Sequence, residues 1–249
     1  MPSIDDHRLA ARLATEAGRL LLAVRAEFAG APAAQLREAG DQRAHAFLMH
    51  QLRAERPGDA VLSEEGADDP ARLDAPRTWI VDPLDGTREF GEPQRTDWTV
   101  HVALVVAGRP IAGAVAQPAL GITLASEPAP MLPPPHQGPL RIVASRSRTV
   151  PAAATLVQAL DGELLLMGSA GAKAMAVLRG EAEVYVHAGG QYEWDSCAPV
   201  AVALAAGLHA SRLDGTPLRY NNRDTYLPDL LICRPELARR CLEVVAAEA

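Results

Sequence analysis

One short stretch constrains the chain more than any other: the strand-like residues 78–81 run directly into Asp82-Pro83-Leu84-Asp85-Gly86-Thr87. An apolar, β-prone segment that ends in a carboxylate, then Pro, then a second carboxylate and Gly leads a strand into a tight turn. Asp82 and Asp85 can point to one spot with the Leu84 carbonyl between them, and such oxygen ligands suit a hard cation such as Mg²⁺. Asp, Pro and Gly also form turns for purely local reasons, so an ordinary surface turn fits this stretch equally well.

The composition is that of an ordinary globular protein. With 249 residues, 48% hydrophobic and 22% charged, the chain can form one large domain or two closely packed lobes. The formal net charge is -7 and no run is rich in Lys or Arg, so we expect no nucleic-acid partner. An acidic protein can still bind an anionic substrate where metal ions reverse the local charge.

Cysteine usage and hydropathy indicate the compartment. Cys197, Cys233 and Cys241 are odd in number and lack CxxC spacing, which favours free thiols in a reducing compartment over a disulfide framework or a zinc site. The apolar run at residues 20–24 is too short for export or for spanning a membrane. We therefore expect a cytoplasmic protein without a membrane partner.

The first half of the sequence predicts two helices followed by strands. Apolar residues at helical spacing predict a helix over residues 5–28, and a second helix is expected to begin near Asp41, which would cap it. A strand over 60–62 ends in Ser63-Glu64-Glu65, and adjacent acids on their own usually indicate a solvated edge. A meander of further strands predicts an antiparallel or mixed sheet. These strands are expected at 98–107, 110–117 and 121–126.

A proline-rich segment separates the two halves. Residues 128–139 contain six prolines, which predicts a loop between an N-terminal α+β lobe, 1–139, and a C-terminal α/β lobe, 140–249. Beyond the loop, strands and helices alternate, as is typical of an α/β layer. Strands are expected at 140–144, 163–167, 182–187, 208–212 and 229–233, and helices at 152–160, 170–178, 195–206 and from 235 onward. We therefore predict an α/β (α+β) sandwich with α/β/α/β/α layers.

Several acidic residues share one kind of position, because each follows a predicted strand or starts a predicted helix. They are Glu64, Glu65, Asp82, Asp85 and Asp195. Strand ends of layered α/β proteins are where ligand crevices form. Two carboxylates ~4 Å apart at an effective dielectric of ~20 repel by on the order of 4 kcal/mol. Clustering of these acids is therefore plausible only around metal. The seven histidines show no ligand spacing and are interpreted as structural.

The order of these motifs resembles the superfamily of lithium-sensitive, Mg²⁺-dependent phosphatases that contains inositol monophosphatases, fructose-1,6-bisphosphatases and bisphosphate nucleotidases. That superfamily has an upstream Asp, then Glu-Glu, then Asp-Pro-(Ile/Leu)-Asp-Gly-Thr, then Trp-Asp and a later Gly-Gly. The matching elements here are Asp41, Glu64-Glu65, residues 82–87 and Trp194-Asp195. The chain departs from the pattern at Leu208, which follows Gly207 where the second Gly is expected. The resemblance spans the whole chain and implies the sugar-phosphatase type of layered fold.

The resemblance also implies a mechanism with two or three Mg²⁺ ions, and with Li⁺ as an inhibitor that occupies one Mg²⁺ position. The implied metal ligands are Glu64, Asp82, the Leu84 carbonyl, Asp85 and Asp195. Asp41 and Thr87 would orient and deprotonate the attacking water, with Asp41 as base, and Glu65 would hold a metal-bound water. The water would attack phosphorus directly, in line, without a covalent enzyme intermediate.

Within the superfamily, the chain is similar to the CysQ branch, which removes the 3′-phosphate of 3′-phosphoadenosine 5′-phosphate to give AMP, clearing a by-product of sulfate activation. The similarity lies in residues 87–90, 168–173 and 193–198. The rival interpretation is a broad-specificity inositol-phosphate or fructose-1,6-bisphosphate phosphatase, because the shape of the pocket around residues 146–193 decides the substrate.

Substrate contacts are expected from two turns. Backbone amides of Gly86 and Thr87, with Arg88 beside them, would bind phosphate at the start of a helix. A second turn of small residues opens another helix, and close packing of that helix on the sheet explains the small residues equally well. Its residues are Gly168, Ser169, Ala170, Gly171, Ala172 and Lys173.

Other side chains are weaker candidates for substrate contacts. Arg146 and Arg148 could hold the second phosphate of a bisphosphate, although solvated surface arginines are the simpler interpretation. By resemblance, Glu193 would accept from a ribose hydroxyl. Tyr192 and Tyr220 could flank an adenine, with structural tyrosines as the alternative.

Two other protein classes fit these motifs less well. Haloacid-dehalogenase-type phosphatases carry an Asp…Asp-Gly-Thr motif with acids two apart near the N-terminus, whereas Asp82 and Asp85 are three apart and lie far downstream. A non-catalytic sensor of bisphosphate nucleotides would not need the water-activating pair Asp41 and Thr87. A homodimer is compatible with the sequence because dimers are common in the superfamily.

Overall fold

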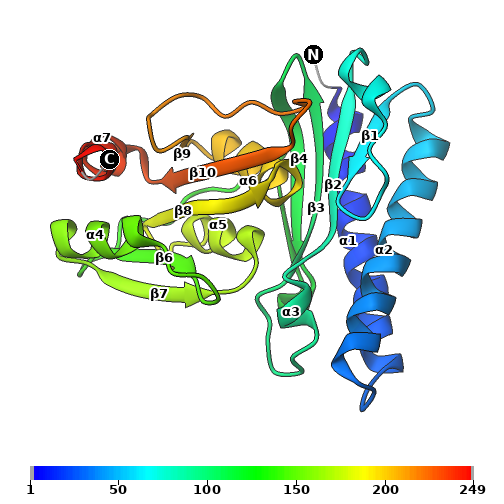
Figure 1. Cartoon of the computed structure of the whole chain (residues 1–249), viewed down its shortest axis with the longest axis horizontal. Helices are drawn as coiled ribbons and strands as arrows, with labels where there is room; N and C mark the ends of the chain where they lie inside the picture. The colour runs from blue at the N-terminus through cyan, green and yellow to red at the C-terminus, as the bar shows by residue number, and fades with distance from the viewer. Residues whose placement is uncertain (1–2, 248–249) are drawn as a thin grey trace.

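The computed structural model describes residues 3–247, which form five layers of alternating helices and strands (Figure 1). The helices are α1 (Ile4–Glu27), α2 (Ala33–Glu55), α3 (Thr87–Phe90), α4 (Pro151–Leu160), α5 (Ala170–Leu178), α6 (Glu193–Ala205) and α7 (Ala238–Ala246), with short 3₁₀ turns at Pro70–Leu73, Pro118–Leu120 and Pro235–Leu237. The strands are β1 (Ala60–Ser63), β2 (Thr78–Asp85), β3 (Thr99–Val106), β4 (Arg109–Gln117), β5 (Ile122–Ala125), β6 (Arg141–Ser145), β7 (Glu163–Met167), β8 (Val184–Tyr192), β9 (His209–Ser211) and β10 (Tyr226–Cys233).

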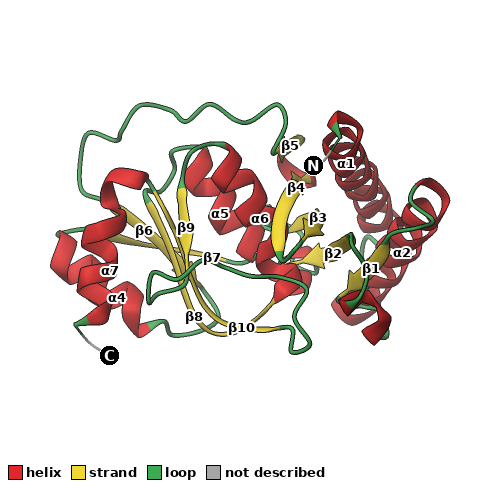
Figure 2. Cartoon of the chain, turned by 90° about the horizontal axis from the view of Figure 1, so that it is seen from above, coloured by secondary structure: helices red, strands yellow, loops and turns green. Residues whose placement is uncertain are grey.

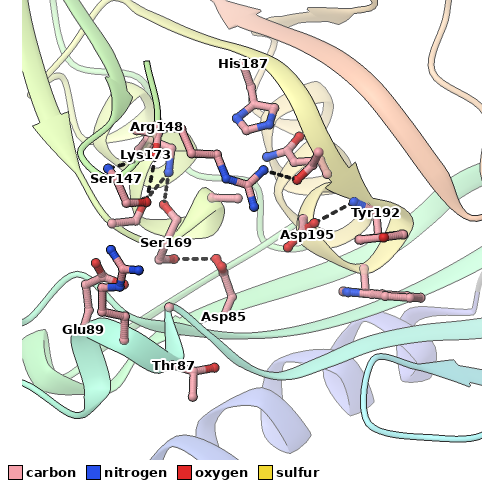
Figure 3. Close-up of a pocket in the computed structure, with 18 of the residues that line it drawn as sticks. Asp85, Thr87, Glu89, Ser147, Arg148, Ser169, Lys173, His187, Tyr192 and Asp195 are labelled. Atoms are coloured by element: carbon pink, nitrogen blue, oxygen red, sulfur yellow. Dashed lines mark hydrogen bonds between the residues drawn. The ribbon is translucent and has the colours of Figure 1, made fainter. Parts of the chain in front are cut away.

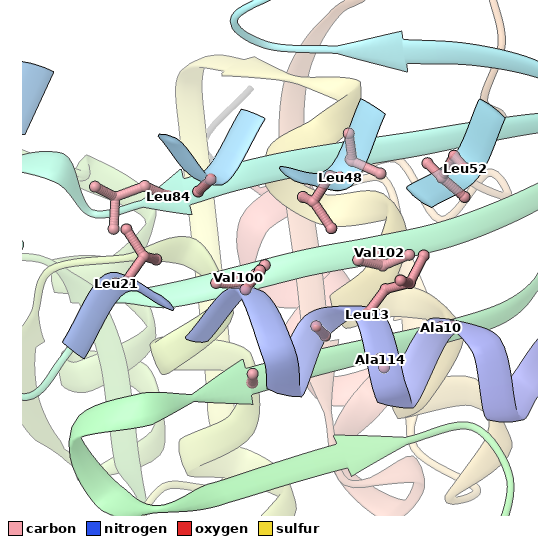
Figure 4. Packing of buried hydrophobic residues seen from close by; sticks show 14 of the residues in the cluster. Ala10, Leu13, Leu21, Leu48, Leu52, Leu84, Val100, Val102 and Ala114 are labelled. Atoms are coloured by element: carbon pink, nitrogen blue, oxygen red, sulfur yellow. The ribbon is translucent and has the colours of Figure 1, made fainter. Parts of the chain in front are cut away.

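The first sheet has the order β1-β2-β3-β4-β5, in which β1 is parallel to β2 and the other pairs are antiparallel. The long helices α1 and α2 cover its outer face (Figures 1 and 4). Leu13 and Leu21 of α1 and Leu48 of α2 pack against Val100 and Val102 of β3 in one buried cluster. The predicted mixed sheet therefore forms because one helical stripe and one strand face bury the same apolar surface.

Helices α5 and α6 form the middle layer between the two sheets (Figure 1). A second buried cluster joins Ile80 and Ala103 of the first sheet, Met175 of α5, Val200 of α6 and Leu230 of the second sheet. Because this core is shared by residues from both halves of the chain, the two sheets are held in a defined relative position. That position decides which side chains meet at the edge between the sheets.

The second sheet has the order β7-β6-β8-β10-β9, with β6 parallel to β7 and β8, and β10 antiparallel to its neighbours. Helices α4 and α7 cover its outer face, where Leu156 and Cys241 join a third buried cluster. The predicted α/β/α/β/α stack is thus confirmed, with one hydrophobic cluster under each outer helical layer and a third that joins the middle helices to both sheets. The loop between β5 and β6, which contains the proline-rich segment, connects the two sheets (Figure 2).

The second helix differs from the sequence prediction. It begins at Ala33, directly after Pro32, so Asp41 lies inside α2 and does not cap it. Pro is well tolerated at a helix start, and the alanines that follow favour helix, which explains why the expected break at residues 30–34 ends early. The correction matters for function, because Asp41 is held by a rigid element.

Two further element boundaries, at the edge between the sheets, differ from the sequence prediction. Strand β8 continues to Tyr192, five residues beyond the expected end, and α6 then starts at once with Glu193. Gly189 and Gly190, both at positive φ, lie in the irregular part of the β8–β10 pairing. Glycines in such a bulge lower the local strand signal in a sequence.

Within residues 3–247, no helix is long and apolar enough to cross a membrane. All three cysteines are buried free thiols.

Candidate active site

The site begins where β2 ends. Asp82 and Asp85 lie on either side of an irregularity in the β2–β3 pairing, with Pro83 between them. Pro lacks the N–H that a regular ladder needs, so it is accommodated at such an interruption, and the bend re-aims the neighbouring side chains. Asp195, in the first turn of α6, joins them so that one carboxylate oxygen from each residue lies within 4.8 Å of the others.

Local hydrogen bonds orient two of these carboxylates. The backbone N–H of Tyr192 donates to Asp195 Oδ2 at 2.6 Å, as expected for an acid that caps the start of α6. The N–H of Leu84 donates to Asp82 Oδ1 at 3.0 Å. Glu64, at the end of β1, lies beside Asp82 and Asp195 and completes the acidic cluster.

The cluster fits a cation. Asp82 is fully buried, and its Oδ2 atom has no hydrogen-bond donor among the described residues. Burial and the neighbouring charges of Glu64 and Asp85 raise the Asp82 pKa well above its usual value, and burial with Asp85 raises that of Asp195 to about 7. Desolvation and the charge of Asp195 raise the pKa of Glu64 to about 8. A set of buried carboxylate oxygens that disfavour one another's negative charge matches the oxygen-only environment of Mg²⁺.

Asp85 differs from its neighbours because donors surround it. The Gly171 N–H donates to Asp85 Oδ2 at 2.8 Å, and the Ser169 hydroxyl donates to the same atom. His101 Nε2 lies 3.3 Å from Asp85 and 2.8 Å from the Thr99 hydroxyl. Burial alone would raise the Asp85 pKa, but the charges of His101 and Lys173 and these hydrogen bonds lower it. Asp85 therefore stays ionised and oriented.

The sequence motifs do not predict this hydrogen-bond network around Asp85. Thr99 and His101 occupy alternate positions of a strand whose other residues are mostly apolar. Two polar residues on one face of a buried strand were the available signal.

Asp41 and Thr87 meet, as the resemblance implied. Thr87 Oγ1 lies 3.4 Å from Asp41 Oδ1 and 3.0 Å from the Leu84 carbonyl oxygen. Burial and the charge of Glu65 raise the pKa of Asp41 to about 7. Gly86, at φ 86°, makes the turn that leads to Thr87, and a Cβ there would lie 3.0 Å from Ser169, so this position requires glycine.

A cavity of about 400 Å³ opens above the acidic cluster (Figure 3). Asp85 and Thr87 lie on one side of it, with His187 and Arg148 on the other. Its volume is within the range of small-molecule sites. Other predicted residues that line it are Glu64, Gly86, Arg88, Ser169, Ala170, Lys173, Tyr192 and Asp195.

Arg146 is a correction to the sequence prediction. Its guanidinium donates to Glu89 and Glu92, each at 2.5 Å, and it does not line this cavity. Arg148 does line the cavity, where it donates to the Gly189 carbonyl at 3.0 Å and to that of Gly190. The two arginines are two residues apart, and only the loop conformation after β6 decides which one reaches the site.

The hydrogen-bond donors in the turn before α5 bond mainly to other residues of the protein. Ser169 and Gly171 donate to Asp85 and so orient the acidic cluster, while the Gly168 N–H donates to Asp97, and these donors are not directed at substrate. Lys173 Nζ donates to the Gly168 carbonyl and, at 2.8 Å, to that of Ser169. Close packing, the alternative left open by the sequence, explains the small residues, since a Cβ on Gly171 would overlap His101.

Glu193 is also a correction. It is fully buried, and its carboxylate accepts from the backbone N–H groups of Asn221 at 2.6 Å and Asn222 at 2.8 Å, so no ribose hydroxyl can reach it. Tyr220 is buried as well, with its hydroxyl 3.1 Å from Ser196. Tyr192 is exposed at the cavity, and its ring stacks on Trp194 with centroids 5.0 Å apart.

Comparison with known proteins agrees with this geometry. The sequence profile of the inositol monophosphatase family matches residues 7–247, and the chain therefore belongs to that family. It is similar to a protein of Mycobacterium tuberculosis named 3′-phosphoadenosine 5′-phosphate phosphatase, with 53% identity over 242 residues, covering 93% of this chain and 90% of the relative. The resemblance to a CysQ-type member of the superfamily is thus confirmed.

Solved structures share the fold. A CysQ protein from Bacteroides thetaiotaomicron superimposes with a TM-score of 0.75 at 29% identity, covering 91% of this chain and 96% of that protein. An inositol monophosphatase from Staphylococcus aureus superimposes with a TM-score of 0.84 at 19% identity, covering 99% of this chain and 97% of the other. The second likeness, at that identity, concerns the fold alone.

Proposed function

We propose that this protein is a Mg²⁺-dependent phosphatase that removes the 3′-phosphate of 3′-phosphoadenosine 5′-phosphate to give AMP and phosphate. The observation that carries the proposal is that Asp85 and Asp195 of the acidic cluster line the same cavity as Thr87, whose hydroxyl lies 3.4 Å from Asp41 Oδ1. A binding protein would have no use for a water-activating pair beside its metal ligands. The choice of substrate is supported by relatives that are named for it and are 50% and 53% identical to this chain.

The residues that would hold the cations are Glu64, Asp82, the Leu84 carbonyl, Asp85 and Asp195. Two or three Mg²⁺ ions at these oxygens would supply Lewis-acid neutralisation of the phosphate charge and a lowered pKa for water. Li⁺ would inhibit by occupying one of the positions. The buried, unpartnered Asp82 Oδ2 atom supports this assignment.

The chain itself would orient and deprotonate the attacking water. The Thr87 hydroxyl, already directed by the Leu84 carbonyl, would position the water, and Asp41 would take its proton. A base acts best when its pKa is near the working pH, and burial beside Glu65 raises the Asp41 pKa to about 7. Amides of Gly86 and Thr87 and the exposed Arg88 would bind phosphate oxygens at the cavity wall.

We also infer that the enzyme works in a reducing compartment such as the cytoplasm. The support is that three cysteines are buried as free thiols, including Cys233 and Cys241, which lie close enough to interact. A secreted protein with this pair would be expected to carry a disulfide.

The test is phosphate release from three substrates at equal concentration: 3′-phosphoadenosine 5′-phosphate, inositol 1-phosphate and fructose 1,6-bisphosphate. Each is measured with Mg²⁺, with a chelator, and with Mg²⁺ plus Li⁺. Asp41→Asn, which keeps the shape of the side chain, is the control for contaminating phosphatases. We expect a kcat/KM preference of at least about a hundredfold for the nucleotide, equivalent to about 2.7 kcal/mol of transition-state binding. Comparable rates on all three would indicate a generalist phosphatase, and no release from any would contradict the enzyme assignment.

A further inference from the structure

The upper wall of the cavity is formed by the last half of β8, which contributes two polar side chains that the mechanism does not use. His187 is 5% exposed and Gln191 is 3% exposed, and both line the cavity. His187 lies across the cavity from Thr87 and Asp85 (Figure 3). The two residues flank Gly189 and Gly190, where β8 departs from regular pairing with β10.

The hydrogen bonding of His187 defines which ring nitrogen carries the proton. His187 Nε2 lies 3.1 Å from the Gly189 carbonyl oxygen, and a carbonyl can only accept, so the ring proton is on Nε2. Burial, with the charges of Lys173 and Arg148, lowers the pKa of His187 to about 4. The ring is therefore neutral near pH 7, and the buried Nδ1 atom carries a lone pair with no donor among the described residues.

Gln191 also has a buried acceptor atom without a donor. Its Nε2 atom donates to the Tyr185 hydroxyl at 2.9 Å, and its Oε1 atom has no partner in the described chain. Residues 3–247 contain four buried side-chain polar atoms without a partner, and a third is the Asp82 oxygen of the acidic cluster. A buried acceptor left without a donor costs about 1–3 kcal/mol, so two of them in one cavity wall indicate that a ligand supplies the donors.

The cations near this wall donate to backbone carbonyls and, among the described residues, to neither acceptor. Arg148 Nη1 donates to the Gly189 and Gly190 carbonyls, and Lys173 Nζ donates to those of Gly168 and Ser169. A phosphate oxygen offers no proton to the lone pairs of His187 and Gln191, so it would leave both acceptors unsatisfied. A group with N–H or O–H bonds would be held.

We propose that His187 Nδ1 and Gln191 Oε1 accept hydrogen bonds from the nucleoside part of the substrate and so select nucleotides over other phosphate esters. This inference rests on the proposed function and adds the residues that determine specificity. Two groups of 3′-phosphoadenosine 5′-phosphate have the required chemistry: the ribose 2′-hydroxyl and the exocyclic amino group of adenine. The 2′-hydroxyl is on the carbon next to the one that carries the attacked phosphate, and the amino group is on the far side of the base.

The experiment compares kcat/KM for three substrates: 3′-phosphoadenosine 5′-phosphate, its 2′-deoxy analogue, and the purine analogue that lacks the 6-amino group. The enzymes are the wild type, His187→Leu, Gln191→Met and the control His209→Leu. His209 lies in β9, where it contacts Ser211, and it does not line the cavity. Thermal unfolding of each variant shows whether it is folded.

We expect the wild type to lose about tenfold or more in kcat/KM on at least one analogue, as a site built for hydrogen bonding rejects a ligand without the donor. That discrimination should fall to about twofold in His187→Leu or Gln191→Met and persist in His209→Leu. The analogue that is discriminated identifies whether the hydroxyl or the amino group is the donor.

Two results would overturn the inference. The first is a wild-type kcat/KM that is the same within about twofold for all three substrates. The second is an equal loss of kcat/KM on all three substrates in folded His187→Leu and Gln191→Met. Both results would mean that water alone meets the two acceptors. Failure of the proposed function is distinguishable, because the wild type would then not turn over 3′-phosphoadenosine 5′-phosphate at all.

Discussion

Replacing Gly113 by alanine should disturb the metal site from a distance. Gly113 lies in β4 under helix α6, and a Cβ built there would be 2.6 Å from Ala201 Cβ and 3.2 Å from the Ala198 carbonyl oxygen. Carbon atoms in contact are about 3.5–4.0 Å apart, so α6 would have to shift by roughly 1 Å. Asp195 is in the first turn of the same helix and would move with it.

The magnitude follows from opposing effects. Overpacking a tight core costs about 1–3 kcal/mol, while the added buried methyl group and the less flexible unfolded chain return part of that. We expect Gly113→Ala to destabilise the fold by about 1–2 kcal/mol. In a chain of 249 residues, this corresponds to a melting temperature about 2–8 °C lower. The apparent Mg²⁺ affinity should fall as well, because one ligand is displaced relative to Asp82 and Asp85.

The assays are thermal unfolding followed by circular dichroism and a Mg²⁺ titration of phosphate release. Gly58→Ala is the matched control, because a Cβ at Gly58 meets nothing within 4 Å. Adding Ala201→Gly to Gly113→Ala removes the closest clash and should restore the Mg²⁺ midpoint more than the melting temperature, since glycine inside a helix costs about 1 kcal/mol. A Gly113→Ala variant with wild-type stability and wild-type Mg²⁺ dependence would refute the reasoning.

Three further predictions concern the acidic cluster, the water-activating pair and the N-terminal helix. Asp82→Asn should lower metal-dependent turnover by orders of magnitude without unfolding the protein, and near-normal turnover would contradict the metal assignment. Thr87→Ala should lower kcat far more than it weakens Mg²⁺ binding; abolished Mg²⁺ binding would show that its role is structural. Burial would raise the Asp6 pKa, but hydrogen bonds from Arg77, the Ser3 amide and Arg56 lower it. The ionised carboxylate therefore stabilises the fold at neutral pH. This stabilisation is lost as pH falls below the unfolded pKa of about 3.9. Arg77→Gln should therefore destabilise the protein at pH 7 in urea unfolding, with a difference from wild type that narrows below about pH 4; a pH-independent difference would contradict this account.

Much of the site could be predicted because its key residues lie in one continuous motif. Asp82, Asp85 and Thr87 are placed by a strand, a proline and a glycine that act over a few residues, so local chemistry was enough to predict where the acids meet. Layer order could be predicted for a similar reason, since the helical and strand periods decide which faces are apolar. The predicted start of α2 was wrong because Pro32 and its neighbouring alanines are equally compatible with a break and with the start of a helix.

Substrate-facing residues could not be predicted in this way. Arg146 and Arg148 are both arginines after the same strand, yet one is held by Glu89 and Glu92 and the other lines the cavity. The Glu193 carboxylate could accept a hydrogen bond from a ribose hydroxyl, but it already accepts from two backbone N–H groups. Which polar group is already satisfied depends on partners far away along the chain.

By itself, the sequence determined the order of helices and strands, the layered fold and the identity of the acidic residues, because these depend on short-range periodicity and on spacing within one turn. Only the tertiary structure decided that Asp41 lies inside helix α2, that Thr99 and His101 support Asp85, and that His187 and Gln191 have acceptors with no partner among residues 3–247. The physical reason is that hydrogen-bond capacity is a property of an atom with all its neighbours. Those neighbours come from both sheets and meet only when the shared core between them has formed.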